Sequence, residues 1–181
     1  MEHLVIYGDF NCPFSALASS RADRLERGGT ATVDWRAVEH DPDIPPTGIR
    51  VVDDVAVEVD REIDQVRELV AAGESFKLRR PAVRSNTHAA VAAYAATEPS
   101  RRSALRAELF DACWRRGEAL DERLIAGLGC ESSPPSSELV ATWRDEWLGT
   151  GRPIVPLMVL ADGYVSRGLG ALARLADLLG T

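Results

Sequence analysis

Residues 4–40 read "LVIYGDFNCPFSALASSRADRLERGGTATVDWRAVEH". In the first two thirds of this stretch the spacing of apolar residues changes once, from that of a strand to that of a helix. The run LVIY (4–7) is short, apolar and bounded by Gly8 and Asp9, which indicates a buried strand. From residue 14 onward, apolar side chains recur every three or four positions. That spacing predicts a helix, and the sequence RGG at 27–29 supplies a stop.

The second strand follows directly. Residues 30–40, TATVDWRAVEH, alternate with period two, with Val33 and Trp35 on one side and Asp34 and Arg36 on the other. This alternation is typical of a half-buried strand. A strand, a crossover helix and a second strand of this size predict a parallel pair and an α/β layered structure.

The remainder of the chain is helical in the middle and returns to strand character near its end. A Pro-rich segment at 40–50 breaks regular structure, and five helices are then predicted, over residues 60–74, 86–96, 102–117, 120–129 and 136–149. The sequence IVPLMVLADGYVSRG (154–168) holds two apolar runs around Asp162-Gly163, which predicts a hairpin. A leucine-rich helix over 169–180, with Leu169, Leu172, Leu175, Leu178 and Leu179 on its inner side, closes the chain.

We therefore expect an α/β domain, formed by residues 1–60 and 150–181, that is interrupted by an all-helical insertion over residues 61–149. An antiparallel strand from the hairpin can join such a mixed sheet.

Composition and charge narrow the function classes. The chain has 181 residues, 45% of them apolar and 27% charged, which is typical of a globular protein and not of a disordered one. The formal charge of −7 and the pI of about 5.0 disfavour nucleic acid as a partner. No apolar run reaches the roughly 18 residues of a membrane helix, and the start MEHLVIYGDF lacks the features of a secretory signal. We expect a cytoplasmic protein with no membrane partner.

Cys12 is the first candidate for chemistry because it lies where the first strand turns into the first helix. Unpaired N–H groups and the helix dipole favour a thiolate at such a place, and Pro13 fits the first helical turn because its missing N–H costs nothing there. The alternative is that Cys12 is a small buried hydrophobic residue, as many free cysteines are. The neighbouring carboxylate of Asp9 acts against ionisation, since it raises the pKa of a nearby thiol.

The other cysteines and the histidines carry weaker signals. Cys113 has apolar neighbours at helical spacing and is predicted to lie in the core, whereas Cys130 precedes a Ser/Pro-rich loop and is predicted to be exposed. A pairing of Cys12 with Cys130 requires Cα atoms within about 7 Å, which the sequence does not show. His88 is expected at a packing or surface position. The three cysteines form no disulfide framework, and cysteines and histidines show no zinc-site spacing, so no metal is predicted.

Four stretches in order along the chain suggest a family: YGDFNCPFS (7–15), SNTHAAVAAYAA (85–96), LRAELFDACWRRGEAL (105–120) and IVPLMVLADGYVSRG (154–168). The chain resembles the DsbA-like thioredoxin-fold proteins, in particular the FrnE-type oxidoreductases. Those are similar to 2-hydroxychromene-2-carboxylate isomerases and kappa-class glutathione transferases. The resemblance implies a thioredoxin-like fold with an inserted helical domain.

The resemblance also implies roles for individual residues. By position, Cys12 corresponds to the nucleophilic cysteine, and Val155 and Pro156 correspond to a cis-proline loop that faces it. Asn86 and Thr87 would lie near the cleft on the side of the insertion. Pro13 and Phe14, beside Cys12, complete the expected substrate-binding residues, which are then Pro13, Phe14, Asn86, Thr87, Val155 and Pro156.

Ser15 departs from the redox members of the family, which carry a resolving cysteine at this position. A hydroxyl cannot close an intramolecular disulfide, so three functions remain open. Cys12 could act as a monothiol on protein or small-molecule disulfides, with glutathione as cosubstrate and no tightly bound cofactor. The site could instead belong to a glutathione-dependent isomerase or transferase, in which Ser15 or Cys12 holds a bound thiolate. The fold could also serve as a non-catalytic peptide-binding module, and a homodimer is compatible with each.

Overall fold

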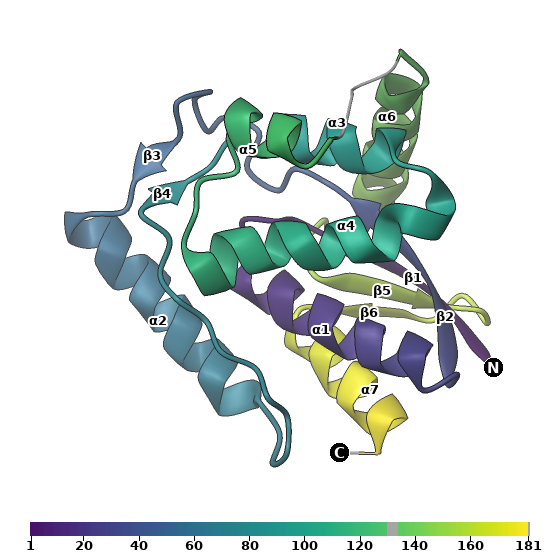
Figure 1. The fold of residues 1–181 in the computed structure, drawn as a ribbon. Coiled ribbons are helices and arrows are strands. Elements are labelled where there is room, and N and C mark those ends of the chain that lie inside the picture. The colour runs from purple at the N-terminus through teal and green to yellow at the C-terminus, as the bar shows by residue number, and fades with distance from the viewer. Residues whose placement is uncertain (130–133, 181) are drawn as a thin grey trace.

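The computed structural model describes residues 1–129 and 134–180 of the chain (Figure 1). It confirms an α/β arrangement in which strands lie at both ends of the chain and helices fill the middle. In chain order the elements are β1 (Glu2–Gly8), α1 (Pro13–Arg27), β2 (Ala31–Ala37), β3 (Ile49–Arg50), α2 (Asp53–Leu69), β4 (Val83–Arg84), α3 (His88–Ala96), α4 (Pro99–Asp111), the π-helical turn η1 (Ala112–Arg116), α5 (Glu122–Gly127), α6 (Pro134–Gly149), β5 (Leu157–Leu160), β6 (Val165–Arg167) and α7 (Leu169–Leu179).

The main sheet has four strands in the order β2-β1-β5-β6. β1 and β2 are parallel, as the β-α-β pattern predicts, with Ile6 opposite Trp35. β5 pairs antiparallel with β1 and places Met158 opposite Ile6, and β6 completes the predicted hairpin antiparallel to β5. The first and last parts of the chain therefore meet at the centre of the sheet, where Tyr7 of β1 lies opposite Leu157 of β5.

Helix α1 follows β1 directly and is fixed at both ends by local chemistry. The Cys12 side chain caps its N-terminus and Pro13 occupies the first helical turn, where no amide donor is needed. At the other end the chain turns at Gly28 and Gly29, and Gly29 has a φ of +66°, which glycine adopts without strain. α1 packs against α7, and both helices lie on the same face of the sheet (Figure 1). The crossover therefore delivers Cys12 to the end of β1.

The central helices differ from the sequence prediction at one boundary that matters for the domain division. α2 begins at Asp53, and the expected division at residue 60 falls inside this helix. Two carboxylates in its first turn, Asp53 and Asp54, favour the earlier start through the helix dipole. Its end at Leu69, where residue 74 was expected, is followed by a turn in which Glu74 accepts a hydrogen bond from the Ala71 amide at 2.8 Å.

A buried ion pair holds this turn against the sheet domain. The guanidinium of Arg21 in α1 donates to both carboxylate oxygens of Glu74, at 2.9 and 2.8 Å, and the two side chains are 2% and 4% exposed. Arg21 also donates to the carbonyl oxygens of Leu69 and Leu172, so it joins α1 to the ends of α2 and α7. α2 otherwise lies at one edge of the molecule (Figure 1).

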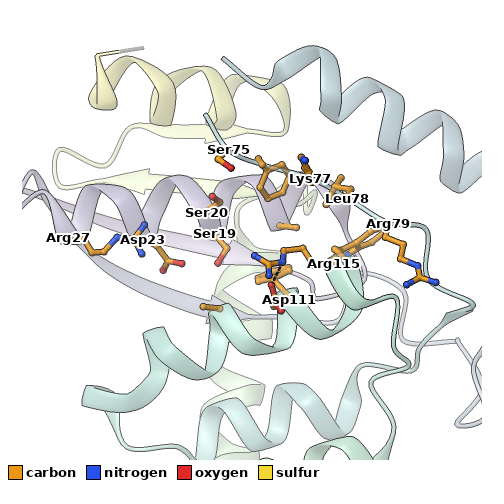
Figure 2. A pocket seen from close by; sticks show the side chains of 15 residues that line it. Ser19, Ser20, Asp23, Arg27, Ser75, Lys77, Leu78, Arg79, Asp111 and Arg115 are labelled. Atoms are coloured by element: carbon orange, nitrogen blue, oxygen red, sulfur yellow. Dashed lines mark ion pairs between the residues drawn. The ribbon is translucent and has the colours of Figure 1, made fainter. Parts of the chain in front are cut away.

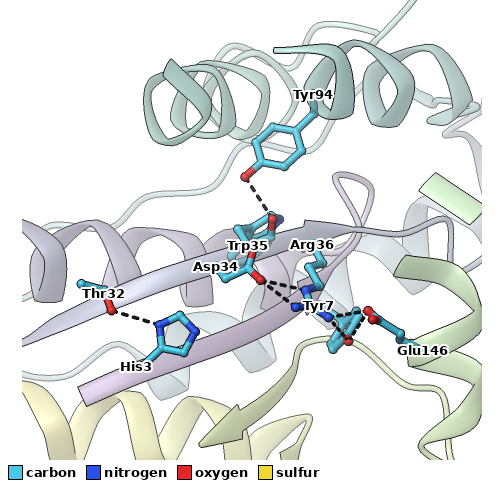
Figure 3. A network of polar contacts seen from close by, with 8 residues as sticks. All are labelled: His3, Tyr7, Thr32, Asp34, Trp35, Arg36, Tyr94 and Glu146. Carbon is cyan, nitrogen blue, oxygen red and sulfur yellow. Dashed lines mark hydrogen bonds and ion pairs between the residues drawn. The ribbon is translucent and has the colours of Figure 1, made fainter. Parts of the chain in front are cut away.

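Two helices of the middle segment, α3 and α6, pack on the sheet at β2. α3 packs against α6, and both contact β2. A polar network ties α6 to the sheet (Figure 3): the hydroxyl of Tyr7 donates to Glu146 at 3.2 Å and accepts from Arg36 at 2.9 Å. Arg36 also forms ion pairs with Asp34 and Glu146. The middle segment is therefore anchored to β1 and β2 by charged groups as well as by apolar packing.

The C-terminal helix matches its predicted range, and its leucines divide between core and surface. Leu172 and Leu175 are fully buried, but Leu169, expected on the inner side, is 59% exposed. Leu169 is the first helical residue after Gly168, so it lies at the helix end, outside the stretch that packs on α1. Among the described residues, no helix has both the length and the apolar character needed to cross a lipid bilayer.

Candidate active site

The site is centred on Cys12, whose side chain is partly exposed at the N-terminus of α1. Its sulfur accepts a hydrogen bond from the Ser15 amide at 3.4 Å, which satisfies one of the free N–H groups of the first turn. Cys12 thus has the predicted strand-to-helix position, and its sulfur faces the helix N-terminus. Pro13 next to it is buried, and Phe14 is partly buried.

Ser15 is fully buried below Cys12. Its hydroxyl oxygen accepts from the Asp9 amide at 3.4 Å, and its side chain and amide both hydrogen-bond the Cys12 sulfur and lower the pKa of that thiol. Ser15 therefore offers the Cys12 sulfur a hydrogen bond, and its hydroxyl cannot form a disulfide with that sulfur.

Val155 and Pro156 lie across from Cys12 although 143 positions separate Cys12 from Val155 in the sequence. The Val155–Pro156 peptide bond is cis, and the Cys12 thiol donates to the Val155 carbonyl oxygen at 4.0 Å. The pairing of β5 with β1 at the centre of the sheet brings Val155 and Pro156 close to Cys12, because Pro156 directly precedes β5 and Cys12 follows β1. The structure thus brings the N-terminal and C-terminal motifs together.

Asp9 is a buried carboxylate immediately behind the cysteine turn. It accepts hydrogen bonds from the amides of Asn11 and His40, both at 2.8 Å, and from the Thr87 hydroxyl at 3.4 Å. Burial raises the pKa of Asp9, and the two amide donors act against that rise. The carboxylate thus holds together the cysteine turn, the segment after β2 and the start of α3.

The balance of these groups keeps the Cys12 thiol protonated. Burial raises the pKa of Cys12 from 9.0 to about 11, and the charge of Asp9 acts in the same direction. Hydrogen bonds from Ser15 and from the Phe14 amide lower the pKa, but by less than burial raises it. The sequence predicts two opposing effects, a helix N-terminus that lowers the pKa of this thiol and the Asp9 carboxylate that raises it. In the structure burial acts with Asp9, and the desolvation of a charged sulfur outweighs the hydrogen bonds that favour the thiolate.

Of the two residues predicted near the cleft on the side of the insertion, Thr87 is linked to the cysteine turn and Asn86 is not. Thr87 reaches the cysteine turn through Asp9, whereas Asn86 donates to the Ile44 carbonyl oxygen at 2.6 Å and accepts from the His88 amide. Among the described residues, no polar contact joins Asn86 to Cys12.

Two residues that bind the cysteine turn to the insertion were missed. The Asn11 side chain donates to the Ser85 carbonyl and accepts from the Ser85 amide at 3.1 Å, which is a two-way bridge to the segment before α3. Ser85 in turn accepts from the Leu120 amide at 2.8 Å. Asn11 stands next to Cys12 in the sequence, and an amide side chain that both donates and accepts is suited to such a bridge, but its partner lies 74 positions away.

The remaining candidates are not part of the site. Cys113 is fully buried, as predicted, and burial, followed by the charge of Asp9, raises the pKa of its thiol. Cys130 lies outside the described residues, so its pairing with Cys12 stays a hypothesis. His88 is exposed and pairs with Glu39 at 3.0 Å. Over residues 1–129 and 134–180, no cluster of three or more histidine, cysteine or acidic side chains is arranged to hold a metal ion.

Residues 3–128 match the family described as the DSBA-like thioredoxin domain. The chain belongs to this family. No curated protein matches the sequence.

Solved structures show the same fold over nearly the whole chain. A 2-hydroxychromene-2-carboxylate isomerase superposes with a TM-score of 0.72 at 22% identity, covering 98% of this chain and 94% of the other. A "probable DsbA oxidoreductase" from Streptomyces coelicolor has a TM-score of 0.67 at 16% identity, with 99% and 91% covered. A candidate protein disulfide isomerase from Nitrosomonas europaea has a TM-score of 0.67 at 13% identity, with 97% and 96% covered. These likenesses establish the thioredoxin-like fold of this DSBA-like protein.

Proposed function

We propose that this protein is a thiol-disulfide oxidoreductase with Cys12 as its single reacting thiol. The observation that supports this most directly is the place of the Cys12 sulfur, between the N-terminus of α1 and the Val155 carbonyl. Backbone amides at a helix N-terminus stabilise a sulfur that gains negative charge, and Cys12 is partly exposed, so a substrate can reach it.

The reaction is a pair of exchanges. The Cys12 thiol first loses its proton to solvent, and the thiolate attacks one sulfur of a substrate disulfide. A bond forms between the Cys12 sulfur and that sulfur, the substrate S–S bond breaks, and the departing thiolate takes up a proton. A second thiol then attacks the mixed disulfide and releases Cys12 as a thiol. Ser15 cannot perform this second attack, so the resolving thiol comes from outside, with glutathione as the cosubstrate that we propose.

The Val155 edge is the proposed substrate-binding element. Its carbonyl oxygen faces the sulfur, and an extended chain that pairs with this edge would present its disulfide to Cys12. Pro13 and Phe14 border the same turn. This arrangement can accept a disulfide of a protein or of a small molecule. We also propose that the protein acts in the cytoplasm.

Intact-mass analysis after incubation with oxidised glutathione tests this function. We expect the wild-type protein to gain one glutathione more than Cys12→Ser, because any adduct on Cys113 or Cys130 forms in both proteins. Cys12→Ser is a suitable control because its hydroxyl keeps an acceptor at the helix N-terminus, as N-cap serines do. Equal adduct formation in the two proteins would place the reacting thiol elsewhere and contradict the proposal.

A second candidate function is a glutathione-dependent isomerase or transferase. It is favoured by the raised pKa of Cys12, because a neutral thiol is a hydrogen-bond donor and can hold the thiolate of bound glutathione without reacting. The structural likeness to 2-hydroxychromene-2-carboxylate isomerase agrees with this reading of the fold.

Calorimetric titration with reduced glutathione separates the two candidates. Non-covalent binding of reduced glutathione by the wild type, with no Cys12 adduct after incubation with oxidised glutathione, would favour the isomerase or transferase. An adduct of oxidised glutathione on Cys12 and no binding of reduced glutathione would favour the oxidoreductase.

A further inference from the structure

We propose a second ligand site in this protein, a cavity that takes small aromatic organic anions. The cavity has a volume of about 520 Å³ and lies between α1, residues 75–79 and the α4–η1 helix (Figure 2). That volume is within the range of roughly 300–1,000 Å³ typical of small-molecule sites. Cys12, Ser15 and Val155 do not line it, so the inference does not depend on the function proposed above.

The floor of the cavity is aromatic and fixed. Phe110 and Trp114 line it and are 5% and 3% exposed. The Trp114 indole donates to the Phe10 carbonyl at 2.8 Å, and the Phe110 ring packs against Phe10 with centroids 5.0 Å apart. Both rings are held from behind, so the parts of them that reach the cavity, together with Phe76 and Leu78, form a preformed apolar lining, which favours a hydrophobic ligand.

Two serines add polar groups to the wall that faces this floor. Ser19 and Ser20 on α1 line the cavity, and the Ser19 side chain projects into the space between α1 and α4 (Figure 2). A hydroxyl can donate a hydrogen bond to a polar atom of a ligand or accept one from it.

The charges around the cavity leave a positive excess. Four cationic and two acidic side chains line the cavity: Arg27, Lys77, Arg79 and Arg115 against Asp23 and Asp111. Asp23 pairs with the buried Arg106, which also pairs with Glu26, and Asp111 pairs with Arg115 at 2.6 Å and with Arg116 at 2.7 Å. Three cationic lining residues, Arg27, Lys77 and Arg79, have no ion pair in the described part of the chain. In a protein with a net charge of −7, an unbalanced cationic rim above an aromatic floor selects anions over neutral compounds.

Calorimetric titration of the full chain with naphthalenesulfonate and with neutral naphthalenesulfonamide tests the site. We expect the sulfonate to bind with one-to-one stoichiometry and the sulfonamide to bind at least about threefold more weakly, because an exposed charge contributes a factor of about two to five. Lys77→Gln combined with Arg79→Gln removes two charges and should weaken sulfonate binding about tenfold. Arg174→Gln, an exposed arginine on α7 away from the cavity, should leave it unchanged.

A second pair of variants tests the location. Ala107 is an exposed lining residue on α4, and Ala107→Trp places an indole at the cavity mouth, so sulfonate binding should be lost. Ala104→Trp adds the same side chain to an exposed position of α4 that does not line the cavity, and should bind normally. Thermal unfolding of each variant establishes that it is folded. No sulfonate binding by the wild type, equal binding of the neutral compound, or full binding by Ala107→Trp would each overturn the proposal.

Discussion

The protonation state of Cys12 leads to a quantitative prediction for the pH dependence of its reactivity. With a pKa of about 11, about one Cys12 in 10⁴ is a thiolate at pH 7, against about one in 100 for an ordinary thiol of pKa 9.0. A more basic thiolate is intrinsically more nucleophilic, and a Brønsted coefficient of about 0.45 over two pKa units makes the Cys12 thiolate about eightfold more reactive than an ordinary thiolate. Cys12 should therefore exchange with disulfides about tenfold more slowly at pH 7 than an unperturbed thiol.

The assay is the initial rate of thiol release from excess dithiodipyridine, measured with the wild type and with Cys12→Ser as the background from Cys113 and Cys130. The rate that belongs to Cys12 should rise about tenfold for each pH unit up to about pH 10, because the thiolate fraction does so below the pKa. In Asp9→Asn the inflection should lie at a lower pH, since the charge that raises the pKa of Cys12 is gone.

Circular dichroism across the same range is the necessary control. The folded-state pKa of Cys12 lies above its ordinary value, so its contribution to the free energy of unfolding is complete below pH 9 and is lost as the pH rises toward 11. A Cys12 inflection at or below about pH 8 in the folded protein would refute the reasoning that burial outweighs the helix N-terminus.

Two further predictions concern stability. Glu74→Gln leaves the buried guanidinium of Arg21 without its bidentate partner and should lower the free energy of unfolding by about 3 kcal/mol in urea titrations; an unchanged midpoint would contradict this role. Burial raises the pKa of Glu74, but the hydrogen bonds and charge of Arg21 hold it below 4.5. The stabilisation by this pair is therefore complete above pH 4.5 and is lost as the pH falls further. Gly8→Ala places a Cβ 2.2 Å from the Trp35 ring and should lower the free energy of unfolding by about 1–3 kcal/mol. Gly149→Ala, whose Cβ would have no atom within 4 Å, should not lower it. Equal thermal midpoints for the two variants would show that the end of β1 is not tightly packed.

Much of the fold could be predicted because its signals are local. The change from period two to period 3.6 near Cys12, and the Asp162-Gly163 turn, each depend on residues close in sequence, and the parallel pair and the hairpin are as expected. The predicted helix begins at residue 60, whereas α2 begins at Asp53, where Asp53 and Asp54 in the first turn favour a helix N-terminus. The exposure of Leu169 was missed because periodicity does not show where packing ends.

In the candidate site, too, the features that depend on neighbouring residues could be predicted from local patterns and those that depend on distant residues could not. The sequence by itself determined that Cys12 lies at a strand-to-helix turn with Ser15 one turn later, because caps, prolines and periodicity act over a few residues. The approach of Val155 to this sulfur was predicted only through the family resemblance and not from local patterns, and the structure confirms it. Only the tertiary structure decided that Asn11 is bridged to Ser85 and that the thiol stays protonated. Those outcomes depend on burial and on partners tens of residues away, and the balance between desolvation and hydrogen bonding is set by the whole surrounding structure.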